Sequence, residues 1–269
     1  MKVLSPAKVN LMLRILGQRD DGYHLLQTYF QLLDWGDYMK FTPSPSNNIT
    51  IHGNFKDLKQ QDNLIYKAAE LLSPHNKTKQ GIDITVDKNI PQGSGLGGGS
   101  SNAGTTLRIL NHMWQCDLSQ QELQEIAIKL GADVPVFVLN KSAMATGIGE
   151  NLTPYQIDSY YFVLIFPKTS ISTMDVFNSQ NLDRNQSKIK LCEINNKNTW
   201  DNACLDIVLN KYPEVNKIYK KSSVIAPTYM SGTGSTLFCC FSNVLDAEHF
   251  MQDCPEYWDT VLCQSQKIQ

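Results

Sequence analysis

The sequence lacks several features that mark whole classes of protein. It has no run of about 18 uninterrupted apolar residues, so a membrane-spanning helix is not expected. The apolar positions near the N-terminus are interrupted by polar residues and a proline, unlike a signal-peptide core. Lysine and arginine number 24 against 26 acidic residues and form no long basic tract, so a nucleic-acid-binding surface is not indicated. We therefore expect a cytoplasmic protein that binds a small molecule, with neither nucleic acid nor membrane as a partner.

Cysteine is present, but in no pattern that implies a metal centre or a disulfide framework. The seven cysteines are an odd number, and none are spaced as C-x-x-C. They are expected to be buried, reduced thiols. The composition of the 269-residue chain, 42% hydrophobic and 19% charged, is typical of a globular protein.

Hydrophobic periodicity predicts a mixture of strands and helices. The first forty residues read as strand, turn and strand. A helix capped by Asp62 follows, and a strand from residue 81 leads into a glycine-rich loop that opens a second helix. Ser119 and Glu122 have the spacing of a capping box at the start of a third helix. The apolar run VPVFVL after Asp133 is predicted to be a buried strand.

The pattern changes near residues 151–159, which indicates a soft boundary between two domains. Beyond it the segments YFVLIF, TYM and TLFCCF read as strands. Helices are expected near residues 201–210, 213–222 and 244–252. The second domain is therefore predicted to be an α+β unit.

Residues 91–104, PQGSGLGGGSSNAG, contain six glycines and no lysine. Glycines leave backbone N–H groups unshielded, and the following helix adds the positive end of its dipole, so the loop suits phosphate oxygens. A flexible connector is the alternative reading. A Walker A loop is excluded because its lysine is absent. Gly93, Gly95 and Gly98 match G-x-G-x-x-G, but the acid of a dinucleotide fold should end a strand, whereas Asp117 lies between two helices.

Three motifs follow one another in a fixed order along the chain: PAKVNL at residues 6–11, the glycine loop, and SGTGST at residues 231–236. Together they resemble the superfamily of galactokinase, homoserine kinase, mevalonate kinase and phosphomevalonate kinase. Within it, DGYH at residues 21–24, LGADVPVF, GIGE and ISTMDVF look like the 4-diphosphocytidyl-2-C-methyl-D-erythritol kinases. Gln18 and Thr236 depart from the family pattern, and Thr236 bears on how closely the last glycine turn approaches the substrate phosphates.

The resemblance implies an α+β fold of two domains with the active site in the cleft between them. Residues 1–155 would form a ribosomal-S5-like α/β domain that binds nucleotide and carries catalysis. Residues 156–269 would form a ferredoxin-like α+β domain that binds substrate. The implied reaction is ATP-dependent phosphorylation, with Mg²⁺, of the 2-hydroxyl of 4-diphosphocytidyl-2-C-methyl-D-erythritol in the methylerythritol phosphate route to isoprenoids. The chain could be a monomer or a homodimer.

The resemblance also assigns catalytic residues. Asp133 would be the general base, although an aspartate after a helix-ending glycine is also common as a cap or in a surface turn. Lys8 would stabilise the attacking oxygen, although a lysine in an alternating strand is ordinarily a solvated outer-face residue. Asn10 shares the face of Lys8 and could hydrogen-bond the substrate.

Recognition of cytosine is assigned to an aromatic pair and a histidine. Tyr23 and Phe177 would cover the two faces of the base, and His24 would read its polar edge. The alternative is that both aromatics are core residues and His24 is a turn histidine.

The nucleotide is assigned to the glycine loop and two flanking side chains. Ser100 and Ser101 could cap the helix, or one of them could contact the magnesium ion as well, and the metal ligands are not determined. The expected nucleotide-binding residues are Asn63, Lys88, Pro91, Gly93, Ser94, Gly95, Leu96, Gly97, Gly98, Gly99, Ser100 and Ser101.

Two other functions stay open at this point. A mevalonate or homoserine kinase has the same three motifs, but this function would not explain the DGYH segment. A non-catalytic RNA-binding module of related fold is the second alternative, and the net charge of −2 argues against it.

Overall fold

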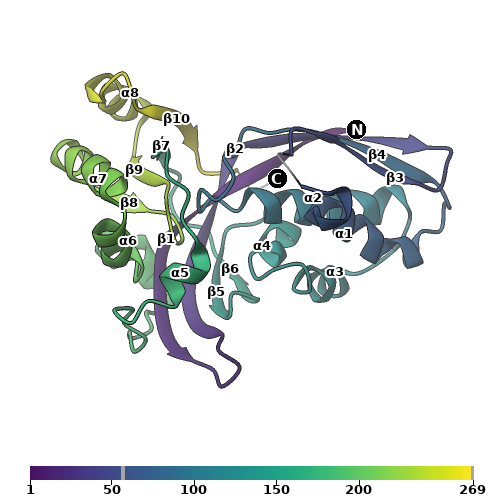
Figure 1. Cartoon of the computed structure of the whole chain (residues 1–269), viewed down its shortest axis with the longest axis horizontal. Helices are drawn as coiled ribbons and strands as arrows, with labels where there is room; N and C mark the ends of the chain where they lie inside the picture. Colours follow the sequence, from purple (N-terminus) through teal and green to yellow (C-terminus); the bar gives the residue numbers. More distant parts are fainter. Residues whose placement is uncertain (56–57, 268–269) are drawn as a thin grey trace. The chain divides into compact units, whose positions relative to one another are not determined.

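The computed structural model describes residues 1–55 and 58–267. Figure 1 shows its strands and helices, which mix along the chain and confirm the α+β class. In chain order they are β1 (Lys2–Gln18), β2 (His24–Ser44), β3 (Ile49–Gly53), α1 (Leu64–Leu72), β4 (Gly81–Asp87), α2 (Gly98–Met113), α3 (Gln120–Ala127), α4 (Val134–Leu139), β5 (Ala143–Gly147), β6 (Asn151–Pro154), β7 (Tyr161–Phe166), α5 (Thr173–Phe177), α6 (Leu205–Lys211), α7 (Pro213–Ile225), β8 (Thr228–Met230), β9 (Leu237–Phe241), α8 (Val244–Asp253) and β10 (Asp259–Gln264).

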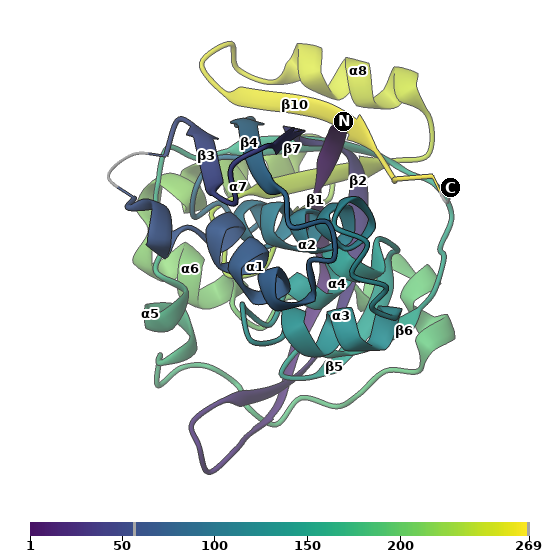
Figure 2. The ribbon, with the colours of Figure 1, turned by 90° about the vertical axis from the view of Figure 1, so that its right-hand side faces the viewer.

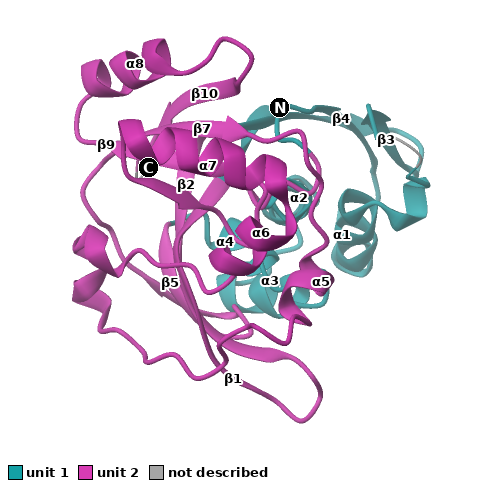
Figure 3. Cartoon of the chain, turned by 60° about the vertical axis from the view of Figure 1, so that its left-hand side comes forward, with its two compact units in different colours: residues 1–7, 35–91, 97–141 teal, residues 8–34, 92–96, 142–269 magenta. Residues whose placement is uncertain are grey.

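Contacts divide the chain into two compact units, which Figure 3 colours separately. The first unit comprises residues 1–7, 35–91 and 97–141, and the second comprises residues 8–34, 92–96 and 142–269. Strands β1 and β2 thus contribute residues to both units. The domain boundary near residue 155 stays a prediction. No helix in the described part of the chain is both long enough and apolar enough to cross a membrane.

In the first unit, β4 lies between β3 and the C-terminal part of β2. It pairs antiparallel with β2 and parallel with β3. Helices α1 and α2 lie side by side under this sheet, as Figures 1 and 2 show. Phe41 and Ile84 of the sheet pack with Ala68 of α1 and Leu107 of α2 in one buried cluster. This packing holds α2, the helix that follows the glycine loop, against the sheet.

Residues Val134–Leu139 form helix α4, so the predicted strand over VPVFVL is wrong. A run of six apolar residues fits a buried strand and a buried helix equally, because neither shows a polar face. Pro135 lies in the first turn of the helix, where its fixed φ and missing N–H are tolerated. Residues 134–138 are all buried, and a β-carbon added at Gly104 of α2 would lie 2.6 Å from Phe137 Cβ. Close packing against α2 therefore decides the conformation.

The expected helix near residue 62 is present as α1, but its cap is Asn63 and not Asp62. The Asn63 side chain accepts a hydrogen bond of 3.0 Å from the Ile65 N–H. The capping box at α3 is confirmed, since Ser119 and Glu122 bond each other's backbone N–H groups. Both corner residues of a capping box lie within one turn, so the sequence carries that signal fully.

In the second unit, the N-terminal part of β2 pairs antiparallel with β5, and β5 pairs with β6. A separate antiparallel sheet has the strand order β10-β7-β9-β8. Its inward residues, including Val163 and Leu237, form one cluster with Val208 of α6, Val215 of α7 and Phe250 of α8. The strands and helices expected after residue 160 are thus confirmed.

All seven cysteines are free thiols. Four of them, Cys116, Cys204, Cys239 and Cys263, are buried as expected. Cys240 and Cys254 are only partly buried and Cys192 is exposed, so the expectation of burial is wrong for Cys192 and holds only in part for the other two.

Candidate active site

Lys8 lies on β1 and is only 3% exposed, so it is not a solvated outer-face residue. Its ammonium donates one hydrogen bond to the Asn10 Oδ1 atom and another of 2.9 Å to the Gly95 carbonyl. The Phe30 ring lies beneath it, with 5.4 Å from Nζ to the ring centroid. A buried cation is held in one place because its charge must remain paired with oxygen atoms.

Asn10 is 4% exposed, and its side chain is engaged within the protein. Its Oδ1 accepts from Lys8, and its Nδ2 donates 2.7 Å to the Thr28 hydroxyl. Its backbone N–H donates 3.2 Å to Ser231 Oγ. Asn10 therefore orients Lys8 and connects β1 with the SGTGST turn.

Gly95 of the glycine loop packs directly on the SGTGST turn. Its carbonyl accepts 2.9 Å from Ser231 Oγ, and the backbone N–H of Thr236 donates 3.1 Å to the Ser94 carbonyl. A β-carbon at Gly95 would lie 2.3 Å from Ser231 O and 2.8 Å from Gly234 O. The backbone there has φ of +79°, which also favours glycine. Residues from each of the three sequence motifs therefore meet in the second unit.

The start of α2 offers backbone donors that its N-cap residue, a glycine, does not cap. Gly97 precedes the helix in the left-handed conformation, with φ of 72°, and as a glycine it has no side chain that could cap the helix. The first N–H groups of a helix have no partner within it, so they remain available to an anion. The 16-residue helix also places the positive end of its dipole there.

The two serines of the loop differ in their surroundings. Ser101 is fully buried, and its hydroxyl donates 2.6 Å to the Pro6 carbonyl and lies 2.8 Å from Ser5 Oγ. It therefore neither caps α2 nor remains available to a metal ion. Ser100 is half-buried. Among the loop residues before it, Pro91 and Gly93 are exposed, and Ser94 and Leu96 are buried.

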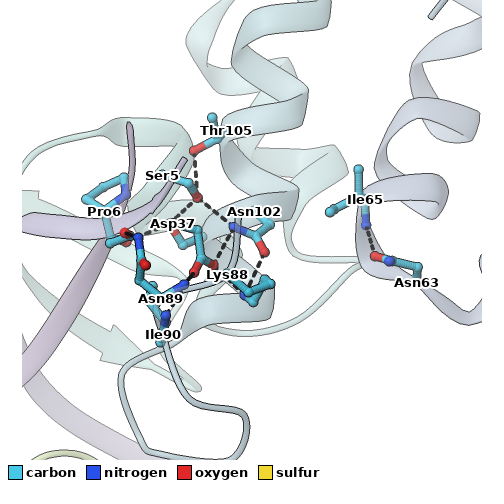
Figure 4. A network of polar contacts seen from close by, with 12 residues as sticks. Ser5, Pro6, Asp37, Asn63, Ile65, Lys88, Asn89, Ile90, Asn102 and Thr105 are labelled. Atoms are coloured by element: carbon cyan, nitrogen blue, oxygen red, sulfur yellow. Dashed lines mark hydrogen bonds and ion pairs between the residues drawn. The ribbon is translucent and has the colours of Figure 1, made fainter. Parts of the chain in front are cut away.

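Lys88 belongs to a polar network around Asp37, which Figure 4 shows from close by. The Asp37 carboxylate is fully buried and accepts from the Lys88 ammonium and from Asn102 Nδ2. Its other oxygen accepts hydrogen bonds from the backbone N–H groups of Asn89, at 2.8 Å, and Ile90, at 2.9 Å. Asp37 thus fixes the turn that leads from β4 into the glycine loop. Sequence reasoning missed it, because an aspartate in an alternating strand looks like an outer-face residue.

The network also brings Lys88 to the start of α2. A β-carbon added at Gly98 would lie 3.5 Å from Lys88 Nζ. The Lys88 side chain keeps 23% of its surface exposed, in contrast to the fully buried carboxylate that holds it. The Lys88 ammonium, which is ion-paired with Asp37, therefore lies near the first backbone N–H groups of α2. This combination suits a phosphate group.

Asp133 is the residue before α4 and is half-buried. Its side chain makes no capping hydrogen bond to α4. The reading of Asp133 as a helix cap therefore does not hold.

His24 and Phe177 stack on each other in the second unit, with ring centroids 5.3 Å apart and an angle of 28° between the planes. His24 is 9% exposed, and Arg184 donates 3.1 Å to its Nε2 atom. Burial, and then the positive charge of Arg184, lower the pKa of His24 below its ordinary 6.5. The neighbouring Tyr23 ring is 60% exposed. Sequence reasoning did not identify Arg184, which lies in a loop without motif.

Within residues 1–55 and 58–267, no three side chains of histidine, cysteine, aspartate or glutamate gather into a metal site. Of the residues expected to contact the substrate or nucleotide, Lys8, Asn10, Tyr23, His24 and Phe177 lie in the second unit. Asn63, Lys88, the start of α2 and Asp133 lie in the first.

The sequence matches the family model of the GHMP kinases N terminal domain over residues 63–141. It is 46% identical over 254 residues to the 4-diphosphocytidyl-2-C-methyl-D-erythritol kinase of Psychromonas ingrahamii, which covers 94% of this chain and 89% of that protein. A Marinomonas protein of the same name is 44% identical over 264 residues, and the match covers 98% of this chain and 86% of that protein. The crystal structure of a 4-(cytidine 5'-diphospho)-2C-methyl-D-erythritol kinase is similar, with a TM-score of 0.85, 27% identity, and 99% and 100% coverage. A homoserine kinase from Cytophaga hutchinsonii has the same fold, with a TM-score of 0.67, 16% identity, and 99% and 94% coverage.

Proposed function

Because the chain belongs to the family of 4-diphosphocytidyl-2-C-methyl-D-erythritol kinases, we propose that Lys8 and Asp133 catalyse its ATP-dependent phosphoryl transfer. The acceptor is the 2-hydroxyl of the methylerythritol unit, and the reaction belongs to the methylerythritol phosphate pathway of isoprenoid synthesis. The hydroxyl oxygen forms a bond to the γ-phosphorus, the bond from that phosphorus to the β–γ bridging oxygen breaks, and ADP leaves.

The hydroxyl proton needs an acceptor as the oxygen attacks. The assignment of Asp133 is supported by its position directly before α4 and by its partial burial. The assignment of Lys8 is supported by its burial and by the oxygen atoms that hold its ammonium in place. A fixed cation stabilises developing negative charge more strongly in a site from which water is excluded.

The triphosphate is assigned to the glycine loop. Support comes from the uncapped N-terminus of α2 and from Lys88, which the buried Asp37 holds near it. Asn63 is assigned to the neighbourhood of the adenine, although its Oδ1 atom also caps α1.

Magnesium is expected to arrive with ATP. Ser100 is the loop serine that suits it, because the Ser101 hydroxyl is already bonded to Pro6 and Ser5. Mg²⁺ usually keeps several waters and binds through phosphate oxygens and one or two protein ligands, so a cage of side chains is not required. When bound, it would supply charge neutralisation for the β- and γ-phosphates.

The cytosine is assigned to Tyr23, His24 and Phe177. The exposed Tyr23 ring offers one face for stacking, and the ring stack of His24 and Phe177 offers a second aromatic surface. Stacking on rigid rings is sequence-tolerant, so selectivity must come from hydrogen bonds to the edge of the base.

The observation that carries this proposal is the 2.9 Å hydrogen bond from the buried Lys8 ammonium to the Gly95 carbonyl, which joins a candidate catalytic group to the phosphate loop. The test is an assay of ADP release with the diphosphocytidyl substrate beside mevalonate and homoserine. We expect turnover with the first substrate and a fall in kcat of about 10²- to 10⁴-fold for Asp133→Asn, with ATP binding retained.

The matched control is Asp253→Asn, at the exposed end of α8, which should turn over at the parental rate. Parental turnover by Asp133→Asn would remove the base assignment. Turnover of mevalonate or homoserine in preference to the diphosphocytidyl substrate would overturn the substrate assignment.

A further inference from the structure

The guanidinium of Arg184 is held by four hydrogen bonds. Its Nε donates 3.1 Å to His24 Nε2, and its Nη1 donates 3.1 Å to the Leu182 carbonyl. Its Nη2 donates 3.0 Å to each of the carbonyls of Phe177 and Ser179. The planar group therefore has one orientation, set by three backbone oxygens and one imidazole nitrogen.

This arrangement decides which imidazole nitrogen of His24 carries the proton. Arginine stays protonated in proteins and has no acceptor, so Nε2 of His24 must be the unprotonated nitrogen that accepts. A neutral imidazole with a bare Nε2 carries its hydrogen on Nδ1. The pKa of His24 is lowered by burial and by the charge of Arg184, so the neutral ring persists at neutral pH. Within the described residues, no group hydrogen-bonds to Nδ1.

The same guanidinium also holds the stacking partner of the histidine. Phe177 ends α5, and its carbonyl accepts from Arg184 while its ring stacks on His24. Removal of Arg184 would therefore release both the tautomer of His24 and the backbone that carries Phe177.

We infer that Arg184 is a positioning residue that gives the site its preference for cytosine over uracil, by fixing His24 as an Nδ1–H donor. The inference rests on the proposed cytosine site. Ring atom N3 is a bare acceptor in cytosine and an N–H donor in uracil. An Nδ1–H group can pair with the first, whereas with the second two donors face each other and neither is satisfied. A buried donor left without a partner costs enough binding free energy for about a tenfold to hundredfold discrimination.

The test uses Arg184→Met in the full chain, with the diphosphocytidyl substrate and its uridine analogue. We expect the ratio of the two kcat/KM values to fall by about tenfold or more, through a higher KM for the cytidine substrate, with kcat and the KM for ATP nearly unchanged. A purely structural role would lower kcat/KM for both substrates equally and would overturn the inference.

The matched control is Arg14→Met. Arg14 holds the same segment of chain, through a 2.9 Å hydrogen bond to the Ser187 carbonyl and an ion pair with Asp201, but it does not contact His24. It should leave the ratio of the two kcat/KM values unchanged.

A spectroscopic measurement on the parental protein keeps the inference testable even if Arg184→Met does not fold. Long-range ¹⁵N–¹H correlation spectra of the labelled imidazole should show hydrogen on Nδ1 of His24 in the parental protein, and a shift toward Nε2–H in Arg184→Met. Hydrogen on Nε2 in the parental protein would overturn the inference.

Two variants distinguish an error in the proposed cytosine site from an error in the role of Arg184. If His24→Gln leaves the preference for cytidine unchanged, the base is not read at His24 and the proposed site is wrong. If His24→Gln removes the preference while Arg184→Met retains it, only the role of Arg184 is wrong.

Discussion

Ser231 donates a 2.9 Å hydrogen bond to the carbonyl of Gly95, although 136 positions separate the two residues. The same carbonyl accepts from the Lys8 ammonium at 2.9 Å. One backbone oxygen thus connects the N-terminal motif, the glycine loop and the C-terminal glycine turn. A change at this oxygen should affect stability and catalysis together, because all three motifs depend on it.

The close approach at Gly95 predicts the effect of Gly95→Ala. The left-handed backbone costs a non-glycine residue about 1–2 kcal/mol. The added methyl group would also clash with the carbonyls of Ser231 and Gly234, and overpacking of this kind costs a further ~1–3 kcal/mol. We expect the free energy of unfolding, measured in urea, to fall by about the sum of the backbone cost and the overpacking cost. We also expect kinase activity to be lost.

Gly93→Ala is the matched control for this prediction. Its backbone is also left-handed, with φ of +68°, but its β-carbon would lie 3.4 Å from Ser170 Oγ. The free energy of unfolding of Gly93→Ala should fall by only about 1–2 kcal/mol, the cost of the backbone conformation. Equal losses at Gly93 and Gly95 would show that the contact with the glycine turn is unimportant.

Local signals in the sequence were sufficient for several elements. The capping box at Ser119 lies within one turn of helix, and the strand before the glycine loop alternates with the period of two. The helix over Val134–Leu139 could not be recognised, because its sequence is apolar throughout and its conformation depends on packing against α2. The sequence alone does not predict the conformation of a segment that depends on packing against a distant element.

The site shows the same division. Lys8 and Gly95 lie in recognisable motifs, so the resemblance to a kinase family identified them. Asp37 and Arg184 could not be found in this way, because their partners lie 51 and 160 positions away. Only the folded chain brings each of them to the group that it holds.

The buried carboxylate of Asp37 predicts a large loss of stability for Asp37→Asn. The change removes the charge opposite Lys88 and turns an amide N–H₂ toward Lys88 or Asn102, both of which are donors. Breaking a buried ion pair at one partner costs about 3–5 kcal/mol. Unfolding in urea should show this loss, and the KM for ATP should rise because the entry to the glycine loop is no longer fixed.

Asp117→Asn is the control, because Asp117 forms an exposed ion pair with Lys77, with side chains 75% and 58% exposed. An exposed pair contributes no more than about 1 kcal/mol. Similar losses for the two variants would contradict the structural role given to Asp37.

The exposed ring of Tyr23 predicts a binding effect without a stability effect. Its backbone is held by the 2.8 Å bond from Arg19 N to its carbonyl, while the ring is 60% exposed. Stacking on one base contributes about 1–3 kcal/mol, so Tyr23→Ala should raise the KM for the cytidine substrate by roughly 5- to 150-fold. Tyr23→Phe should retain the parental KM. Tyr257→Ala changes a tyrosine of equal exposure and should leave the KM for the cytidine substrate unchanged. If Tyr23→Ala also keeps the parental KM, Tyr23 does not contact the substrate.

The lowered pKa of His24 predicts how substrate binding depends on pH. Burial disfavours the charged imidazolium, and Arg184 repels it, so the neutral ring persists below the ordinary pKa of 6.5. The KM for the cytidine substrate should therefore stay constant as the pH falls through 6.5 and should rise only at more acidic pH.

The same shift affects stability with a definite sign. In the unfolded chain His24 takes up a proton near pH 6.5, whereas in the folded protein it does so only at lower pH. Its contribution is fully present above pH 6.5 and is lost as the pH falls from there through the lower folded pKa, because the unfolded state binds more protons. Urea unfolding of His24→Gln should accordingly show a weaker loss of stability below pH 6.5 than the parental protein. His249→Gln, on the exposed face of α8, should follow the parental profile, and identical profiles for His24→Gln and the parental protein would show that His24 titrates normally.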